Sequence, residues 1–348
     1  MFETWTEPSL IRYPDFHDTF GTYVISSLSD SEILNIPTIG LIGTDNSADK
    51  IRKELYALAY PFSNCKVLDL GNLTKKGTDE LGVLLQEVIK KGILPILISS
   101  DKGVILEQVQ AGTQLAPSSS WVVIHPTLGH DIHLLSKIEP LCLSGSIKVR
   151  FLGHQTHLTP ASAIATLHDL DLESLRLGHV RQNLDRVEPW CRSVDHAIFD
   201  VNALRKTDFN AKADSNPGGF FYEEACKIAQ FIGASSHLQS FGIYGYQTQL
   251  DHDGISAAVI AQLIWYTIDG LNNFREEKNI QKQKLTQYIV HASHNDMDIN
   301  FWKSQDSGRW WMEVPGHEHH WISCTYDDYL EASHGDFSQR LINVLNRM

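Results

Sequence analysis

The chain has 348 residues, of which 42% are hydrophobic, so it can bury a large core and does not have the composition of a disordered protein. Its 42 acidic and 29 basic residues give a net charge of −13, which argues against nucleic acid as a partner because phosphate binding needs a positive surface. No apolar run is long enough to cross a membrane, and the N-terminus lacks the pattern of a secretory signal, so we expect no membrane insertion. Five scattered cysteines without a C-x-x-C pair favour a reducing compartment, and we expect the cytoplasm.

Short apolar runs alternate with amphipathic stretches along most of the chain, which is typical of parallel βα units. The runs that predict strands are 36–43, 66–70, 93–98, 120–124, 147–152, 174–177, 194–201 and 238–244. Helical periodicity is clearest at 78–91, 159–168, 222–233 and 253–271. After residue 280 the pattern changes to antiparallel strands at 287–291, 299–303 and 309–314, closed by a helix near 326–333.

This order of elements predicts one large α/β domain with a small C-terminal β/α appendage. Residues 1–35 are expected to be an irregular segment, residues 36–280 the α/β domain, and residues 281–348 the appendage packed on that same domain. No internal repeat and no linker rich in Pro, Gly or Ser interrupts the chain.

Polar residues directly follow four of the predicted strands, where a parallel sheet collects its functional loops. They are Ser-Ser-Asp-Lys at 99–102, His-Pro-Thr-Leu-Gly-His-Asp at 125–131, Gly-His-Gln-Thr-His at 153–157 and Asp-Val-Asn at 200–202. The spacing of these loops, together with His-Ala-Ile-Phe-Asp-Val-Asn at 196–202, resembles the ureohydrolase superfamily of arginase, agmatinase and formimidoylglutamase. Stretches at 176–192, 220–226, 240–244 and 308–314 resemble a bacterial arginase-like branch. The resemblance implies a three-layer α-β-α fold with a mostly parallel sheet of about eight strands.

In that superfamily, the motifs G-G-D-H, D-A-H-x-D and S-x-D-x-D supply six side chains to a pair of Mn²⁺ ions. The positions that match these ligands are Lys102, His125, Thr127, Gly129, Asp200 and Asn202, and of these Asp200 alone keeps the family residue. The family's substrate-contacting glutamate falls near Gly245. An ammonium group has no lone pair for a metal and repels a dication. We therefore predict no metal cofactor, and an ion pair between Lys102 and Asp200 in place of the metal charge.

The leading hypothesis is a protein with a degenerate metal site that acts as a catalytically inactive binding, regulatory or structural protein. Its cleft would bind a small zwitterion or carboxylate through the side chains of Lys102, His125, Gln155, Asp200, Asn202 and Arg205. The alternative is a metal-dependent hydrolase of C–N bonds in linear amidines. In that case His125, Asp200 and Asn202 would hold one metal, helped by His130 and Asp131. The resemblance also implies a homo-oligomer.

Other polar clusters have simpler interpretations. The histidines at 317–320 lack a second ligand motif, so a solvated turn is favoured over a metal site. The stretch 291–298 suits a strand end and turn as well as a cation site, and His154 and His157 suit loop residues. Ser99 and Ser100 lack the elbow motif of a serine nucleophile, and Cys226 is expected in the core. Two consecutive tryptophans at 310 and 311 point to opposite sides of a strand, so one of them is expected to be exposed.

Overall fold

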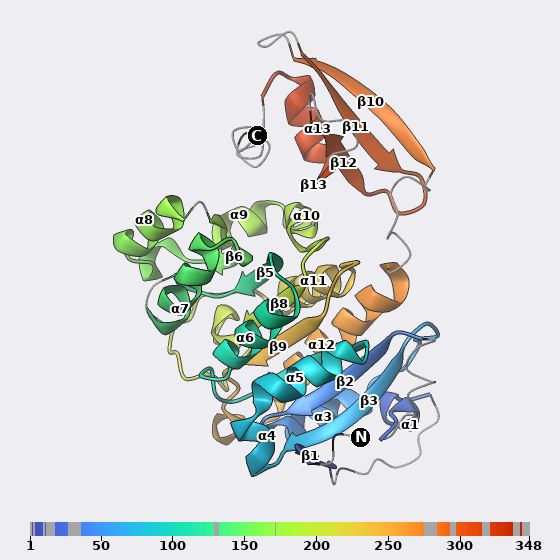
Figure 1. Cartoon of the computed structure of the whole chain (residues 1–348), viewed down its shortest axis with the longest axis vertical. Helices are drawn as coiled ribbons and strands as arrows, with labels where there is room; N and C mark the ends of the chain where they lie inside the picture. The colour runs from blue at the N-terminus through green and yellow to red at the C-terminus, as the bar shows by residue number, and fades with distance from the viewer. Residues whose placement is uncertain are drawn as a thin grey trace.

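The structure is a computed structural model, shown in Figure 1, that describes residues 2, 4–9, 11, 18–26, 36–128, 132–170, 172–274, 284–292, 297–314, 321–336 and 342. Among the described helices, none combines the length and the hydrophobicity needed to cross a membrane.

A central sheet of nine strands organises the α/β part of the chain. In sequence order the strands are β1 (Thr6–Glu7), β2 (Thr38–Gly43), β3 (Lys66–Leu73), β4 (Ile93–Ser99), β5 (Ser119–Ile124), β6 (Ile147–His154), β7 (Glu173–Arg176), β8 (His196–Asp200) and β9 (Ser240–Tyr244). Their order across the sheet is β1-β3-β2-β4-β9-β8-β5-β6-β7, and every pair is parallel apart from β1 with β3. The eight strands expected from the sequence are confirmed. The ninth, β1, is two residues long, too short to give a hydrophobic pattern.

Helices cover both faces of this sheet, which confirms the three-layer architecture (Figure 1). They are α1 (Phe20–Tyr23), α3 (Ser47–Tyr56), α4 (Lys75–Asp79), α5 (Leu81–Lys90), α6 (Ile105–Leu115), α7 (Ile132–Leu143), α8 (Ala161–Asp169), α9 (Leu177–Gln182), α10 (Glu188–Cys191), α11 (Tyr222–Gly233) and α12 (Ile255–Phe274). One hydrophobic cluster joins the sheet to α3, α11 and α12, and a second joins its other face to α5, α6 and α8. The helix predicted at 78–91 is divided at Glu80 into α4 and α5.

The closest helix packing is between α11 and α12, and it depends on two glycines. A Cβ added at Gly233 would lie 1.9 Å from the carbonyl oxygen of Thr267, and one added at Gly270 would lie 2.1 Å from that of Gln230. Because both obstacles are backbone atoms, they cannot rotate away as a side chain could. The two helices can therefore approach this closely only without side chains at these positions.

We expect Gly233→Ala to lower the free energy of unfolding by about 1–3 kcal/mol, the usual cost of an overpacked contact. The measurement is urea unfolding followed by circular dichroism. Gly178→Ala in α9 is the matched control, since a Cβ at Gly178 meets nothing within 4 Å. The control should be neutral or stabilising by about 1 kcal/mol through helix propensity. Equal effects of the two substitutions would mean that α11 and α12 do not meet as described.

The C-terminal part forms a separate antiparallel sheet in the order β10-β11-β12-β13. Its elements are β10 (Leu285–Ala292), β11 (Met297–Ser304), β12 (Trp310–Glu313), β13 (Trp321–Cys324) and α13 (Tyr326–Ser333), where β13 adds a strand to the three that were predicted. The expectation that Trp310 or Trp311 is exposed is wrong, because they are only 6% and 3% exposed. Trp310 stacks on Tyr329 inside the appendage, and Trp311 is covered by the guanidinium of Arg192, 4.8 Å from its ring centre.

Arginines on both sides join the appendage to α10 and its surroundings. Arg192 donates to the carbonyl oxygen of Trp310 at 2.6 Å. Arg309 pairs with Glu188 at 3.0 Å and donates to the carbonyl oxygen of Ala234 at 3.3 Å. These contacts bury Trp311 against the α/β part. The face of β12 that carries Trp311 is therefore an internal surface of the protein.

Candidate functional site

Neighbouring strands bring the predicted site residues to one edge of the sheet. β4, β9, β8 and β5 are adjacent and parallel, so their carboxyl ends lie together. Lys102 follows β4, His125 follows β5 and Asp200 is the last residue of β8. Strand order therefore gathers side chains that are up to 98 positions apart in the sequence.

A buried ion pair forms the centre of this edge. The carboxylate of Asp200 is completely buried, and its Oδ2 lies 2.7 Å from Nζ of Lys102 and 3.0 Å from Nε2 of His125. Its Oδ1 accepts a hydrogen bond of 2.8 Å from the backbone N–H of Asn202. The side chain of Lys102 is 30% exposed and that of His125 is 7% exposed, so solvent reaches the group on the lysine side. The ion pair predicted between Lys102 and Asp200 is present.

Charge and burial act in opposite directions on this carboxylate. Burial raises the pKa of Asp200, but the positive charges of His125 and Lys102 lower it by more, so the pKa lies below its ordinary value. Asp200 is therefore ionised at neutral pH. Nε2 of His125 faces this carboxylate at 3.0 Å, and Nδ1 lies 2.5 Å from the carbonyl oxygen of Thr127. Both ring nitrogens thus face oxygen acceptors, which is the arrangement of a protonated imidazole.

A second lysine beside the centre is absent from the sequence prediction. Lys212 is completely buried, and its Nζ donates to the carbonyl oxygens of Asn202, at 3.2 Å, and of Leu204. Burial is the main cause that lowers the pKa of Lys212, to about 8, while the negative charges of Asp214 and Asp200 oppose this effect. It is still largely protonated at pH 7. The carboxylate of Asp200 thus lies near the cationic side chains of Lys102, His125 and Lys212, and Asp214 places a second negative charge beside Lys212.

Solved structures of known proteins resemble the chain over most of its length. A formiminoglutamase of Trypanosoma cruzi with Mn²⁺ is 14% identical, with a TM-score of 0.60, and the match covers 69% of this chain and 94% of that one. A formimidoylglutamase from Bacillus subtilis is 12% identical with a TM-score of 0.62, and the match covers 78% of this chain and 97% of that one. An arginase from Bacillus subtilis is 15% identical with a TM-score of 0.55, and the match covers 67% of this chain and 98% of that one. The chain has the ureohydrolase fold. No protein-family model and no curated protein sequence matches it.

The positions that match manganese ligands of the ureohydrolase fold have donor atoms already in use. Both oxygens of Asp200 have partners, as described above. The amide oxygen of Asn202 accepts from the backbone N–H of Asp214 at 3.4 Å, and the hydroxyl of Thr127 donates to the carbonyl oxygen of Leu158 at 2.7 Å. A hard dication needs several free carboxylate oxygens, and an ammonium 2.7 Å from the one carboxylate competes directly with it. These residues do not fit a dinuclear manganese site.

Gly245, near the position of the family's substrate-contacting glutamate, leaves room for the lysine. Its φ is +93°, and an added Cβ would lie 3.2 Å from Cε of Lys102 and 3.5 Å from Oδ1 of Asp200. The backbone N–H of Gly245 donates to the carbonyl oxygen of Ser99, which continues the β4–β9 pairing beyond the strands. A larger residue here would be strained and would press on the ion pair. The glycine and the lysine therefore belong to one local arrangement.

The side chains of two other predicted residues contact groups other than Asp200. Gln155 is buried, and its Oε1 lies 2.6 Å from where a Cβ on Gly218 would be. Arg205 pairs with Asp208 at 2.7 Å, and its guanidinium lies 4.0 Å from the ring centre of Phe221. Of the six predicted residues, the structure thus gathers Lys102, His125 and Asn202 around Asp200.

The remaining sequence clusters give no second centre in the described part of the chain. Ser99 donates to the carbonyl oxygen of Asp101, and Ser100 donates to Asp45 at 2.6 Å. His291 and Asp298 form an exposed pair at 2.9 Å across β10 and β11. Within the described ranges, no three side chains of His, Cys, Asp or Glu are grouped as a metal would require.

Some predicted residues lie outside the described ranges, namely His130, Asp131, His294, Asp296 and the histidines at 317–320. His154 is buried at the end of β6, His157 is exposed in the following turn, and Cys226 is buried in α11 as expected.

Proposed function

We propose that this chain is a ureohydrolase-fold protein without the dinuclear manganese chemistry, and that it acts as a catalytically inactive binding protein. The observation that carries the proposal is the ammonium of Lys102, 2.7 Å from the completely buried carboxylate of Asp200. In this arrangement a side-chain cation holds the place where the resemblance puts a metal. A fold by itself does not establish an activity, and it is this ion-pair centre that favours binding over hydrolysis.

The chemistry of the centre suits binding better than hydrolysis. Metal-assisted hydrolysis needs a bound water with a lowered pKa, and the donors that would hold such a metal are engaged by protein groups. The ammonium of Lys102 lies on the side of the centre that solvent reaches, because its side chain is 30% exposed. A small carboxylate or zwitterion that enters on this side would pair with that ammonium. Cytoplasmic location and homo-oligomer formation stay predictions.

We expect less than about 0.2 metal ions per chain in protein expressed with excess Mn²⁺ and then desalted, because a site without free carboxylates should not retain a dication. Elemental mass spectrometry measures this content. The same protein should release no urea, ammonia or formamide from arginine, agmatine or formimidoylglutamate in the presence of Mn²⁺, Zn²⁺ or Co²⁺. A known manganese-dependent arginase treated in parallel checks that both assays work.

The amidine hydrolase remains the competing function, and the same experiment separates the two. One or two metal ions per chain, lost in His125→Ala and in Asp200→Ala, would contradict the proposal and make an amidine substrate screen the next step. Metal that persists in both variants would lie elsewhere and would leave the ion-pair centre as described.

A further inference from the structure

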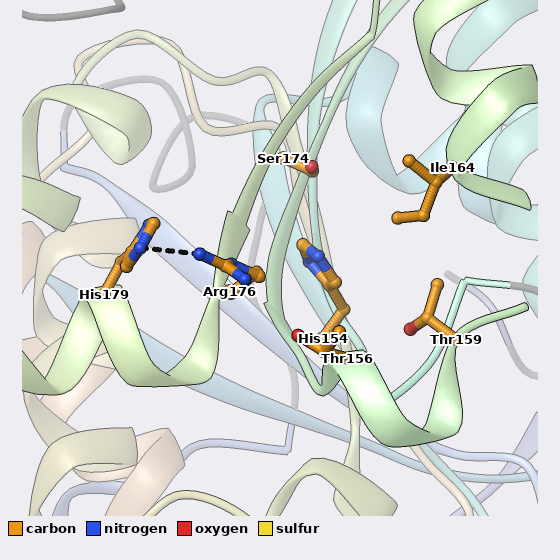
Figure 2. Close-up of a pocket in the computed structure, with 7 residues that line it drawn as sticks. All are labelled: His154, Thr156, Thr159, Ile164, Ser174, Arg176 and His179. Carbon is orange, nitrogen blue, oxygen red and sulfur yellow. Dashed lines mark hydrogen bonds between the residues drawn. The ribbon is translucent and has the colours of Figure 1, made fainter. Parts of the chain in front are cut away.

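A pocket lies at the outer edge of the sheet, beside β6 and β7. It has a cavity volume of about 370 Å³ and is lined by His154, Thr156, Thr159, Ile164, Ser174, Arg176 and His179. Figure 2 shows the imidazole of His154 between Arg176 and Ser174 on one side and Ile164 and Thr159 on the other. None of the residues around Asp200 lines it, so the pocket is distinct from the ion-pair centre.

A bulge in β6 places His154 opposite Arg176. The pairing of β6 with β7 shifts register between Leu152 and His154, and after the shift His154 pairs with Arg176. The residue between, Gly153, has φ +88°, and a Cβ there would lie 2.3 Å from the ring of Phe220. Glycine is thus required in this conformation and at this contact. The bulge therefore fixes the position of the His154 imidazole opposite Arg176.

One ring nitrogen of His154 is buried without a hydrogen-bond partner in the part of the chain that the structure describes. The residue is 2% exposed, and the nitrogen is Nδ1. Burial is the main cause that lowers the pKa of His154, to about 4, and electrostatic interaction with Arg176 and His179 lowers it further, so the ring is neutral at pH 7. Unsatisfied buried polar groups are rare in proteins, and because His154 lines the cavity, a water molecule, an ion or a ligand in the cavity can supply the missing partner.

Arg176 supplies the charge of the pocket. It is exposed at the end of β7, and its Nη2 lies 2.9 Å from Nε2 of His179 (Figure 2). That hydrogen bond orients the guanidinium and leaves its other donors for a ligand. None of the seven lining residues is acidic, so no carboxylate from the lining opposes an anion.

We propose that this pocket binds a small organic anion, whose carboxylate or phosphate group pairs with Arg176 and accepts a hydrogen bond from His154. The planar guanidinium presents parallel N–H donors, which match two oxygens of one oxyanion. The hydroxyls of Thr156 and Ser174 add neutral donors around the same space, while the hydroxyl of Thr159 donates to the carbonyl oxygen of Gln155 at 2.9 Å. Ile164 offers an apolar wall for the rest of the ligand. His179 is a positioning residue, since it acts by holding Arg176.

The test uses the full chain with inorganic phosphate and succinate as probes, in buffers of equal ionic strength. Titration calorimetry gives the affinity, and NMR of protein with isotope-labelled histidine reports on the ring of His154, assigned through His154→Gln. We expect at least one probe to bind and to shift the His154 signals. Arg176→Ala should weaken that binding by about tenfold or more, because a charge-assisted contact is lost.

Lys148→Ala is the matched control, because it removes the same unit of charge from an exposed position at the other end of β6. Its affinity should equal that of the unmodified protein. Binding that Arg176→Ala and Lys148→Ala weaken equally would overturn the proposal, since general charge would then explain it. An absence of His154 shifts with both probes at high millimolar concentration would overturn it as well. A preference for phosphate or for succinate identifies which oxyanion the pocket takes.

Discussion

Replacing Asp200 with alanine is expected to lower the free energy of unfolding by about 3 kcal/mol, toward the lower end of the cost of breaking a buried ion pair because Lys102 is partly exposed. The substitution removes the carboxylate that pairs with Lys102 and His125 and that also acts on the charge of Lys212. It also removes the acceptor of the Asn202 backbone N–H. A buried cation without a counter-charge and a buried N–H without an acceptor both lower the stability of the folded state.

Urea unfolding at pH 7 measures this effect, with Asp306→Ala as the control. Asp306 is an exposed aspartate on the turn before β12, so its loss should change the free energy of unfolding by less than about 0.5 kcal/mol. If Asp200→Ala were as stable as the control and bound the same small molecules as the unmodified protein, the idea of a repurposed polar centre would be wrong.

A second substitution separates lost charge pairing from lost packing. Lys102→Met keeps a long flexible side chain and removes the ammonium. In the Asp200→Ala background we expect it to restore about 1 kcal/mol or more, because the uncompensated charge is then gone. Introduced alone, the same change should destabilise the protein. Opposite signs in the two backgrounds are the signature of a direct interaction between these side chains.

The sequence predicts the sheet well because most of its strands are buried on both faces. Continuous apolar runs such as 93–98 and 120–124 mark such strands directly, and β4 and β5 follow them closely. The ion pair of Lys102 and Asp200 was predictable through the family resemblance, which aligns the two loops. β1 escaped prediction because a two-residue strand leaves no periodic pattern.

Other features depend on long-range packing, which no local pattern encodes. Lys212 lies in a polar stretch typical of a solvated loop, and its burial depends on the carbonyl oxygens of Asn202 and Leu204 that fold back around it. The alternation rule assigned Trp310 and Trp311 to opposite faces but could not show that Arg192 covers the second face. The His154 pocket depends on the bulge at Gly153, which shifts the register of two paired strands.

Acidification should destabilise the protein before its carboxylates are protonated, through two buried histidines. Burial lowers the pKa of His196 to about 3, and burial with nearby positive charge lowers that of His154 to about 4. An unfolded histidine titrates near pH 6.5, so below that pH the unfolded state takes up protons that the folded state does not. Stability is then lost as pH falls from about 6.5 to 4, by on the order of 3 kcal/mol for each histidine. Asp200, with its lowered pKa, adds its own loss only below about pH 4.

The slope of stability against pH tests this expectation. If two protons are taken up on unfolding, the free energy of unfolding changes by about 2.7 kcal/mol per pH unit near pH 5. His196→Asn should reduce that slope by about half. Asparagine preserves a polar atom near the hydroxyl of Ser240, which contacts Nδ1 of His196 at 2.8 Å. His168→Asn is the control, because the side chain of His168 is 91% exposed. If the slope falls equally in both variants, or in neither, then the buried imidazole of His196 does not cause the loss of stability at low pH. If the slope falls in His196→Asn alone, half of the acid sensitivity belongs to the imidazole of His196. This ring stacks on Trp121 of the second hydrophobic cluster, so its effect is on the stability of the core.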